Sequence, residues 1–312
     1  MALNEATSLQ PLRNVLVVGA SGNLAPIIIK TISNDPTFNL TVLSRDGSSS
    51  LASANTKLIR LPTPYQADAL YSVLKGQDAI INMIPPFDLD AHKTVIDVAI
   101  KAGVKRYIPP EFSSRDDNPY VTTRVPFAAV KGNLVDLLVS KEQEGLSWTG
   151  VVCGGFLDWG IKVGFLGLEI ANRKAVLYNN GTQRLDLTLL SDIARAVVGI
   201  LKHPLETKNR RVNINTLFTS PSVILSVLEK QIGQTFDRQL KDADSANKEG
   251  REAVERGDMS GARDMMMGLM SGGAEEMVNG YGKDNDLLLG HGTRSDEYLE
   301  EIVRAVLQGA DL

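Results

Sequence analysis

Short apolar runs alternate with amphipathic stretches through the first half of the chain. Each run is followed by glycine or polar residues, as expected of strands that are buried on both faces of a parallel sheet. Strand patterns that alternate with helical patterns predict an α/β fold with a Rossmann-type, doubly wound parallel sheet. The expected strands are 14–19, 40–45, 57–61, 78–83 and 106–109, and the clearest expected helices are 24–33 and 89–102.

The second half of the chain has a less regular pattern. An amphipathic stretch at 127–141 predicts a helix that leads into a strand at 148–153, and Gly154 and Gly155 then break the pattern. Further expected elements are strands at 175–178 and 211–215 and helices at 190–201 and 222–232.

The pattern divides the chain into two parts. Residues 1–155 form the expected Rossmann domain, and 156–312 form a smaller α/β lobe, with segments near 185–216 returning to the large sheet. From 241 to 286 the chain becomes polar and glycine-rich and holds six of the eight methionines, a mixture unsuited to a sheet core. The glycines interrupt the helical pattern, so we predict a mobile helical flap at 241–286. A loosely packed peripheral helix is the alternative.

Composition excludes several classes of protein. Hydrophobic residues make up 43% and charged residues 22% of the chain, and the formal net charge is −4. Lysine and arginine are scattered, so no nucleic-acid surface is indicated. Asp158 and Lys162 interrupt the most apolar stretch, at 149–171, so no membrane span is expected. The N-terminus lacks a signal-peptide pattern, and the single cysteine, Cys153, indicates a buried thiol in a reducing, cytoplasmic compartment.

A glycine-rich turn joins the first expected strand to the first expected helix. Gly19 allows a tight turn and Gly22 allows a phosphate to approach, while the backbone N–H groups and the dipole of the following helix favour negative charge. Because the motif lies between a strand and a helix, it predicts dinucleotide binding in preference to an ordinary turn. The expected cofactor contacts in this turn are Gly19, Ser21, Gly22, Asn23 and Leu24.

The end of the second expected strand indicates which dinucleotide binds. There the chain reads Ser44, Arg45 and Asp46. An arginine at this position neutralises a 2′-phosphate, whereas an acidic residue accepts hydrogen bonds from the ribose hydroxyls. Arg45 comes first, so NADP(H) is the expected cofactor. Asp46 keeps NAD(H) open, and a solvated surface arginine is the alternative for Arg45.

Three segments together carry a resemblance to a known family. They are Gly19–Ala25, the stretch Val104-Lys105-Arg106-Tyr107-Ile108-Pro109-Pro110-Glu111-Phe112, and Phe127–Lys131. The chain resembles the isoflavone reductase-like, or NmrA-like, branch of the atypical short-chain dehydrogenases, whose fifth strand reads close to Lys-Arg-Phe-x-Pro-Ser-Glu-Phe-Gly. Pro110 stands where that family usually has serine, and Ser113 where it has glycine. The resemblance implies an NADPH-dependent reductase of a natural product in secondary metabolism.

The resemblance also implies where the chemistry occurs. Most short-chain dehydrogenases carry a tyrosine four residues before a lysine, but here Phe127 stands four residues before Lys131. Lys131 alone is therefore the expected proton donor and a cofactor contact. On a helical wheel it lies at the edge of the apolar stripe, so a lysine that merely packs past the core is the alternative. Glu111 is the second catalytic candidate, with a loop carboxylate as the alternative.

The remaining candidates follow from where ligands bind in α/β sheets, at the carboxyl ends of the strands. The expected nicotinamide pocket includes Asn82, Ile84 and Pro85, which follow the fourth expected strand. The three histidines are too dispersed for a metal site, so no metal is expected. The small, largely apolar substrate is expected to contact Pro86, Phe156, Asp158, Trp159, Met266 and Met270, although the aromatic residues could equally serve plain packing.

Two other functions stay open at this point. A proton donor beside a closed pocket also suits a non-redox step of natural-product biosynthesis, such as an acid-assisted ring opening or rearrangement. A protein that binds NADP and regulates a partner according to the redox state of the nucleotide is the other. We expect a monomer or a homodimer without a nucleic-acid or membrane partner.

Overall fold

A parallel sheet organises the N-terminal part of the computed structural model, which describes residues 10–48, 56–115, 119–126, 128–273, 282–310 and 312. Its seven strands lie in the order β11-β6-β5-β4-β1-β2-β3, and all the pairs are parallel. This arrangement confirms the predicted Rossmann-type sheet. The strands are β1 (Asn14–Val18), β2 (Asn39–Arg45), β3 (Thr56–Leu61), β4 (Ala79–Asn82), β5 (Arg106–Ile108), β6 (Ser147–Val152) and β11 (Arg210–Asn213).

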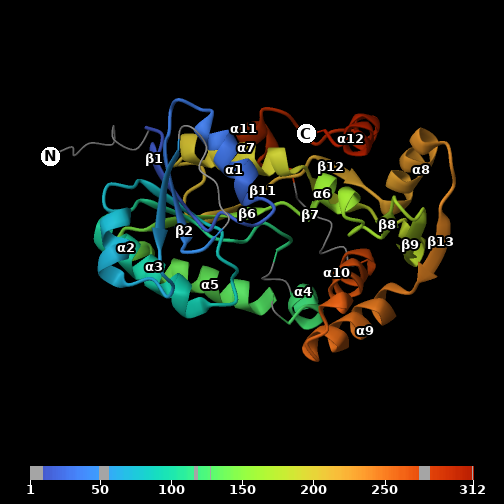
Figure 1. Ribbon diagram of the computed structural model, residues 1–312, viewed down its shortest axis with the longest axis horizontal. Coiled ribbons are helices and arrows are strands. Elements are labelled where there is room, and N and C mark those ends of the chain that lie inside the picture. The colour runs from blue at the N-terminus through green and yellow to red at the C-terminus, as the bar shows by residue number, and fades with distance from the viewer. Residues whose placement is uncertain (1–9, 49–55, 116–118, 127, 274–281, 311) are drawn as a thin grey trace.

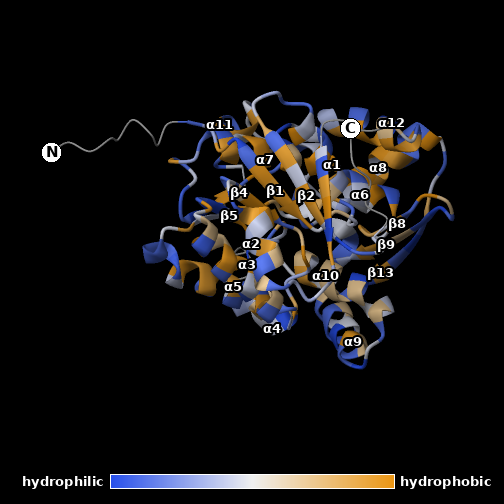
Figure 2. Cartoon of the chain, turned by 60° about the vertical axis from the view of Figure 1, so that its left-hand side comes forward, coloured by the Kyte–Doolittle hydropathy of each residue, from blue (hydrophilic) through white to orange (hydrophobic). Residues whose placement is uncertain are grey.

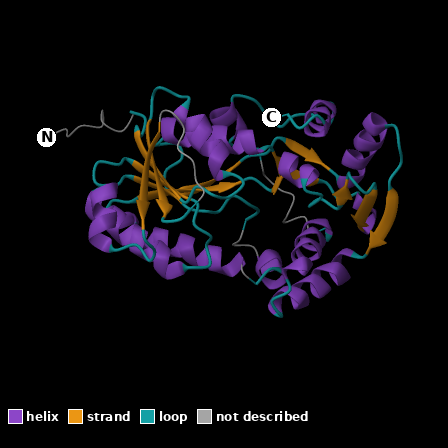
Figure 3. Cartoon of the chain, viewed as in Figure 1, coloured by secondary structure: helices purple, strands orange, loops and turns teal. Residues whose placement is uncertain are grey.

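Helices cover both faces of this sheet (Figure 1 and Figure 3). Because successive side chains of a strand point to opposite faces, Val15 and Val17 of β1 pack with one helical layer and Leu16 and Val18 with the other. Figure 2 shows the strands as predominantly hydrophobic. The first layer contains α1 (Ala25–Ser33) and α7 (Leu190–Lys202), and the second contains α2 (Ala67–Leu74), α3 (Leu89–Ala102) and α5 (Ala128–Ser140).

A smaller lobe with a core of its own follows β6. It contains two three-stranded sheets, in the orders β12-β10-β7 and β13-β9-β8. The segment near 185–216 divides between the two lobes. Strand β10 joins the small lobe, whereas β11 pairs with the large sheet and α7 packs against that sheet. The strands of the small lobe are β7 (Gly155–Phe156), β8 (Leu168–Glu169), β9 (Lys174–Tyr178), β10 (Leu185–Thr188), β12 (Leu217–Thr219) and β13 (Asp237–Lys241). The other α-helices are α4 (Pro119–Arg124), α6 (Leu157–Lys162), α8 (Pro221–Ile232), α9 (Ala243–Glu255), α10 (Ala262–Ser271), α11 (Asn285–Leu289) and α12 (Tyr298–Leu307).

The segment at 241–286 contains a packed helical hairpin, formed by α9 and α10. The prediction that its glycines interrupt the helices is wrong at Gly250 and Gly268, which lie inside α9 and α10. A Cβ atom on Gly250 would lie 2.4 Å from the backbone nitrogen of Met265, so glycine lets the two helix backbones meet. Residues 274–281 of the predicted flap lie outside the described residues.

Candidate active site

A cavity of about 450 Å³ lies at the carboxyl ends of β1, β2 and β4. This is the edge at which open α/β sheets bind ligands. Six of the predicted cofactor residues line the cavity: Gly19, Ser21, Gly22, Arg45, Ile84 and Pro85.

The glycine turn gives this cavity its shape. Gly19 has a φ of +84°, in the left-handed region that favours glycine, and a Cβ atom there would lie 3.3 Å from the carbonyl carbon of Met83. A Cβ atom on Gly22 would meet no other atom within 4 Å, so this side of the turn is open. The turn leads into α1, whose N-cap residue, Leu24, makes no side-chain cap. The start of α1 is therefore suited to bind an anion.

A cationic corner of the cavity surrounds the end of β2. Arg45 lines the cavity with the hydroxyl-bearing residues Ser44, Ser48 and Tyr65, whereas Asp46 is not among the lining residues. Burial raises the pKa of the Tyr65 phenol, and the charge of Arg45 opposes that rise. A guanidinium among hydroxyl groups suits a phosphate monoester. Sequence reasoning missed Ser48 and Tyr65, because they follow β2 and β3 in segments without a recognisable motif.

Four of the predicted cofactor residues, Lys131 among them, do not line the cavity. Asn23 is exposed, and Leu24 is buried at the start of α1. Asn82 is fully buried at the end of β4, where its Oδ1 accepts a hydrogen bond from the Ile84 nitrogen at 2.9 Å. Its side chain therefore supports the loop that lines the cavity.

Lys131 is held by the segment that follows β5. Its half-buried side chain extends from α5, and Nζ donates to Ser113 Oγ at 2.7 Å and to the Glu111 carbonyl at 3.4 Å. Ser113 Oγ itself donates to the Ser114 carbonyl, which leaves its lone pairs for the ammonium group. Ser113 is one of the departures from the family pattern, and here it supplies the hydroxyl that orients Lys131. Phe127 lies outside the described residues.

The side chain of Glu111 pairs with an arginine of β11. Glu111 is 3% exposed, and Arg211 of β11 donates to its carboxylate from Nε at 2.9 Å and from Nη2 at 2.8 Å. Gly150 of β6 makes room for this carboxylate, since a Cβ atom there would lie 1.8 Å from Oε2. Lys131 contacts the backbone carbonyl of the same residue.

Cys153 lies beside the same site at the end of β6. Its backbone nitrogen donates to the Ser113 carbonyl at 3.0 Å. Burial raises the pKa of its thiol to about 12, against the opposing charge of Lys131. The sulfur therefore stays protonated at neutral pH, which does not suit a nucleophile.

The predicted substrate residues lie in the second lobe, apart from Pro86, which follows β4. Phe156 and Trp159 are half-buried and pack edge to face, with ring centroids 6.3 Å apart. Asp158 accepts a hydrogen bond from the Leu190 nitrogen at the start of α7, and burial raises the pKa of its carboxyl group. Its contact is thus with a helix terminus. Pro86 and Met270 are buried, and Met266 is half-buried between α10 and α4.

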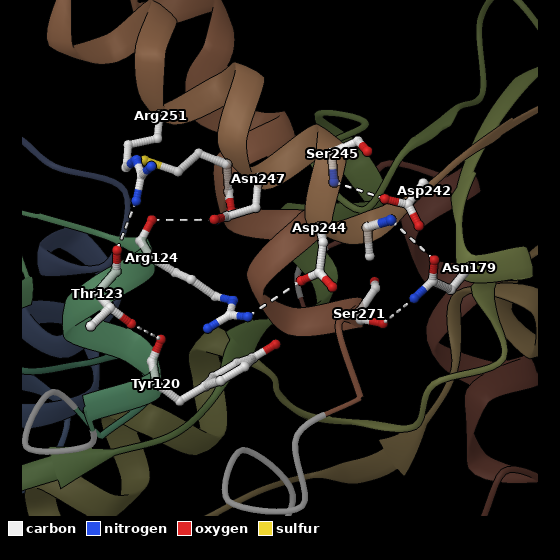
Figure 4. Close-up of polar contacts among 12 residues, drawn as sticks. Tyr120, Thr123, Arg124, Asn179, Asp242, Asp244, Ser245, Asn247, Arg251 and Ser271 are labelled. Atoms are coloured by element: carbon white, nitrogen blue, oxygen red, sulfur yellow. Dashed lines mark hydrogen bonds and ion pairs between the residues drawn. The ribbon is translucent and has the colours of Figure 1, made fainter.

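The α9–α10 hairpin contacts α4, which shortly precedes the helix that carries Lys131 (Figure 4). Arg124 of α4 pairs with Asp244 at 3.4 Å, and Arg251 donates to the Thr123 carbonyl at 2.9 Å. Asn247 Nδ2 donates to the Arg124 carbonyl at 3.3 Å. Beneath these contacts lies a small apolar cluster that joins the two lobes, formed by Val121, Val125, Ala128, Met265 and Leu269.

The described part of the chain contains neither a metal-binding cluster nor a membrane-spanning helix. Its histidine, cysteine and carboxylate side chains form no group of three or more that could hold a metal ion. None of its helices is both long enough and apolar enough to cross a membrane.

Comparison with known proteins identifies the family. The NmrA-like family model matches residues 12–249. Oxidoreductase aprR of Aspergillus flavus is 30% identical over 95% of this chain and 99% of its own length. Isoflavone reductase homolog IRL of Zea mays is 29% identical over 61% of this chain and 62% of its own. The solved complex of leucoanthocyanidin reductase with NADPH from Vitis vinifera has a TM-score of 0.74 and 16% identity, covering 93% of this chain and 99% of that one. The predicted resemblance is thus confirmed, and the chain belongs to the NmrA-like family.

Proposed function

We propose that the protein is an NADPH-dependent reductase of a small, largely apolar natural product. The observation that carries the proposal is the cavity at the carboxyl ends of β1, β2 and β4, which joins an open glycine turn to a guanidinium corner. These features fit the two charged parts of NADPH, the pyrophosphate and the 2′-phosphate. The similarity to a protein named as an oxidoreductase and to a reductase solved with NADPH supports the same reading.

The residues of the cavity fit this cofactor. The open side of Gly22 and the uncapped start of α1 would receive the pyrophosphate, and Arg45 with Ser44 and Ser48 would hold the 2′-phosphate. When bound, NADPH supplies the hydride for the reduction. Ile84 and Pro85 would border the nicotinamide half, because they line the cavity after β4.

Lys131 is the proton donor in this proposal. As negative charge develops on a substrate oxygen, its ammonium group stabilises that charge and supplies the proton. Ser113 Oγ and the Glu111 carbonyl accept hydrogen bonds from the ammonium group and orient it. The salt bridge between Glu111 and Arg211 keeps the Glu111 carboxylate engaged elsewhere. Phe156 and Trp159, with Pro86, Asp158, Met266 and Met270, are the proposed surroundings of the substrate.

The test of Lys131 is the variant Lys131→Met, which retains an unbranched apolar side chain and removes the charge. We expect turnover to fall about 100-fold or more, the size of a general acid's contribution. NADPH affinity and thermal stability should change little. Lys101→Met, an exposed lysine of α3, is the matched control and should keep full turnover. Turnover of Lys131→Met within threefold of the wild type would remove Lys131 from the mechanism.

The assay that tests the reaction class follows both NADPH absorbance and product formation with candidate aromatic substrates. Consumption of NADPH in step with product supports the reductase. Product without consumption of NADPH would replace the reductase with an acid-assisted rearrangement. Binding of NADPH with neither change, across a panel of substrates, would favour a nucleotide sensor.

A further inference from the structure

Three buried polar side chains meet beneath the loop that lines the cofactor cavity. Asn82 ends β4, His92 lies in α3, and Tyr107 lies in β5, and all three are fully buried. Asn82 Nδ2 lies 2.5 Å from Tyr107 Oη and 3.2 Å from His92 Nδ1. His92 Nδ1 also lies 3.3 Å from Tyr107 Oη, and His92 Nε2 lies 3.2 Å from the Pro85 carbonyl oxygen. The three residues, here called the His92 triad, thus connect two strands and a helix to one loop.

Backbone groups fix the direction of every hydrogen bond in the His92 triad. The Ile84 N–H can only donate, so the atom of Asn82 that it contacts is the oxygen and the amide nitrogen faces the ring of His92. That nitrogen is also a donor only, so His92 Nδ1 must accept and carries no proton. The proton of the neutral ring is then on Nε2, where it donates to the Pro85 carbonyl. The two ends of the network give the same tautomer independently.

The surroundings of His92 favour the neutral ring. Burial lowers the pKa of the imidazole, whereas the Pro85 carbonyl and the charge of Asp88 oppose the shift. Asp88 caps the start of α3 by accepting from the Ala91 nitrogen at 2.9 Å. Tyr107 is the titratable group that faces the ring from β5, and burial raises the pKa of its phenol, which therefore stays protonated.

The loop held by the triad has few ways to stabilise itself. Pro85 and Pro86 have no backbone N–H, so they cannot close the loop with donors of their own. Instead, Asn82 Oδ1 accepts a hydrogen bond from the Ile84 nitrogen, and His92 Nε2 donates to the carbonyl oxygen of the next residue, Pro85. Ile84 and Pro85 line the cofactor cavity, with Met83 packed against Gly19. Whatever fixes these two backbone groups also fixes that wall of the cavity.

We propose that His92 is a positioning residue for the nicotinamide half of NADPH, because its neutral ring sets the shape of the loop at Ile84 and Pro85. This inference rests on the proposed function, since it assigns that wall of the cavity to the nicotinamide. His92 itself does not contact the cofactor. Its influence passes through the hydrogen bond to the Pro85 carbonyl. Asn82 and Tyr107 hold the ring in the orientation that makes this bond.

Two substitutions distinguish the contact that His92 makes through Nδ1 from the contact that it makes through Nε2. His92→Gln places an amide donor near the position of Nε2, so it can keep the bond to Pro85. His92→Asn is shorter and can satisfy Asn82, but it does not reach Pro85. We expect the asparagine variant to bind NADPH about tenfold more weakly than the wild type, the effect of one lost buried hydrogen bond. The glutamine variant should recover most of that affinity, and His203→Gln, a half-exposed histidine after α7, should match the wild type.

Calorimetric titration with two ligands distinguishes positioning from general weakening. NADPH carries the nicotinamide half, whereas adenosine 2′,5′-bisphosphate lacks it and contacts only the adenosine side. We expect His92→Asn to lose affinity for NADPH and to bind the bisphosphate within twofold of the wild type. Equal loss for both ligands, unchanged NADPH affinity, or no recovery in His92→Gln would each overturn the inference.

A milder variant keeps the test decisive if His92→Asn does not fold. Tyr107→Phe removes only the hydroxyl that contacts the ring and Asn82, so the fold should survive. We expect it to bind NADPH about threefold more weakly, with bisphosphate affinity unchanged. Equal affinity of Tyr107→Phe and the wild type for NADPH would then overturn the inference. Failure of the wild type itself to bind NADPH would instead overturn the proposed function and this inference with it.

Discussion

Two glycine-rich regions of this chain use the missing side chain for opposite purposes. At Gly22 a Cβ atom would meet no atom within 4 Å, so the space beside it lies open next to the cavity. At Gly268 of α10 a Cβ atom would lie 2.5 Å from the Ala243 carbonyl oxygen and 2.6 Å from the Asn247 nitrogen of α9. The first glycine leaves room for a ligand, and the second lets two helices touch. Glycine content alone therefore indicates neither flexibility nor a ligand site. The groups that face each glycine determine which role it has.

Buried polar groups show a similar contrast between the two lobes. In the His92 triad, each side chain has hydrogen-bond partners with fixed roles. Asp186 of β10 accepts from Asn215 Nδ2 at 2.6 Å through one oxygen, whereas its other oxygen has no hydrogen-bond partner among the residues that the structure describes. Burial raises the pKa of the Asp186 carboxyl group to about 7, against the hydrogen bond from Asn215. The buried polar groups beside the cofactor cavity thus satisfy one another by hydrogen bonds. The Asp186 carboxylate of β10 does so only in part.

Substitution at the closed glycine should have the largest effect on stability. We expect Gly268→Val to lower the free energy of unfolding by about 3–5 kcal/mol, because the added isopropyl side chain would overlap the backbone of α9. Gly22→Val is the matched control and should change stability by no more than about 0.5 kcal/mol. Denaturant unfolding measures both. A Gly268→Val protein as stable as the wild type would mean that α9 and α10 separate easily, as a mobile flap would.

Removal of the charge at Asp186 tests the second contrast. Its folded pKa of about 7 lies above the value of about 3.9 in an unfolded chain, so the folded state binds the proton more tightly. The contribution of Asp186 to stability is fully present below about pH 4 and is lost as the pH rises towards 7. Relative to Asp186→Asn, the wild type should therefore lose about 2–3 kcal/mol of unfolding free energy between pH 4 and pH 7. Parallel pH profiles for the two proteins would show that Asp186 titrates normally.

The cationic corner gives a smaller and more selective effect. Arg45→Glu would place a carboxylate where the 2′-phosphate is proposed to bind, so NADPH affinity should fall about thirtyfold, or roughly 2 kcal/mol. NADH has no 2′-phosphate, and its affinity should change little. Calorimetry with both nucleotides measures the difference. Equal losses for NADPH and NADH would show that Arg45 does not distinguish them.

Much of the fold could be predicted from the sequence, because local patterns determine it. Buried parallel strands are short apolar runs, and the predicted strands at 40–45 and 57–61 match β2 and β3 to within a residue. The glycine turn was also recognisable, because its meaning depends on the strand before it and the helix after it. Short strands such as β7 and β12 lack enough residues to show a period, and the sequence did not reveal them.

The candidate site was less predictable where partners come from distant segments. Glu111 was a catalytic candidate at a strand end, but its partner, Arg211, lies 100 residues later and became visible only in the sheet. The sequence showed only that His92 and the other histidines are too dispersed for a metal site. Its contacts with Asn82 and Tyr107 were not visible, because those residues belong to other elements. Composition suggested a mobile flap at 241–286, whereas the complete burial of Met265 and Met267 follows from how α10 packs.

Titration of the wild type and Gly22→Val with NADPH tests the central claim most directly. The claim is that the open side of Gly22 belongs to a site for NADPH. We predict saturable binding by the wild type, with about 100-fold weaker binding by Gly22→Val, because its side chain would occupy space proposed for the pyrophosphate. The free energy of unfolding without ligand should be nearly equal for the two proteins. Absence of NADPH binding by the wild type, or equal affinities for the two proteins, would contradict the claim.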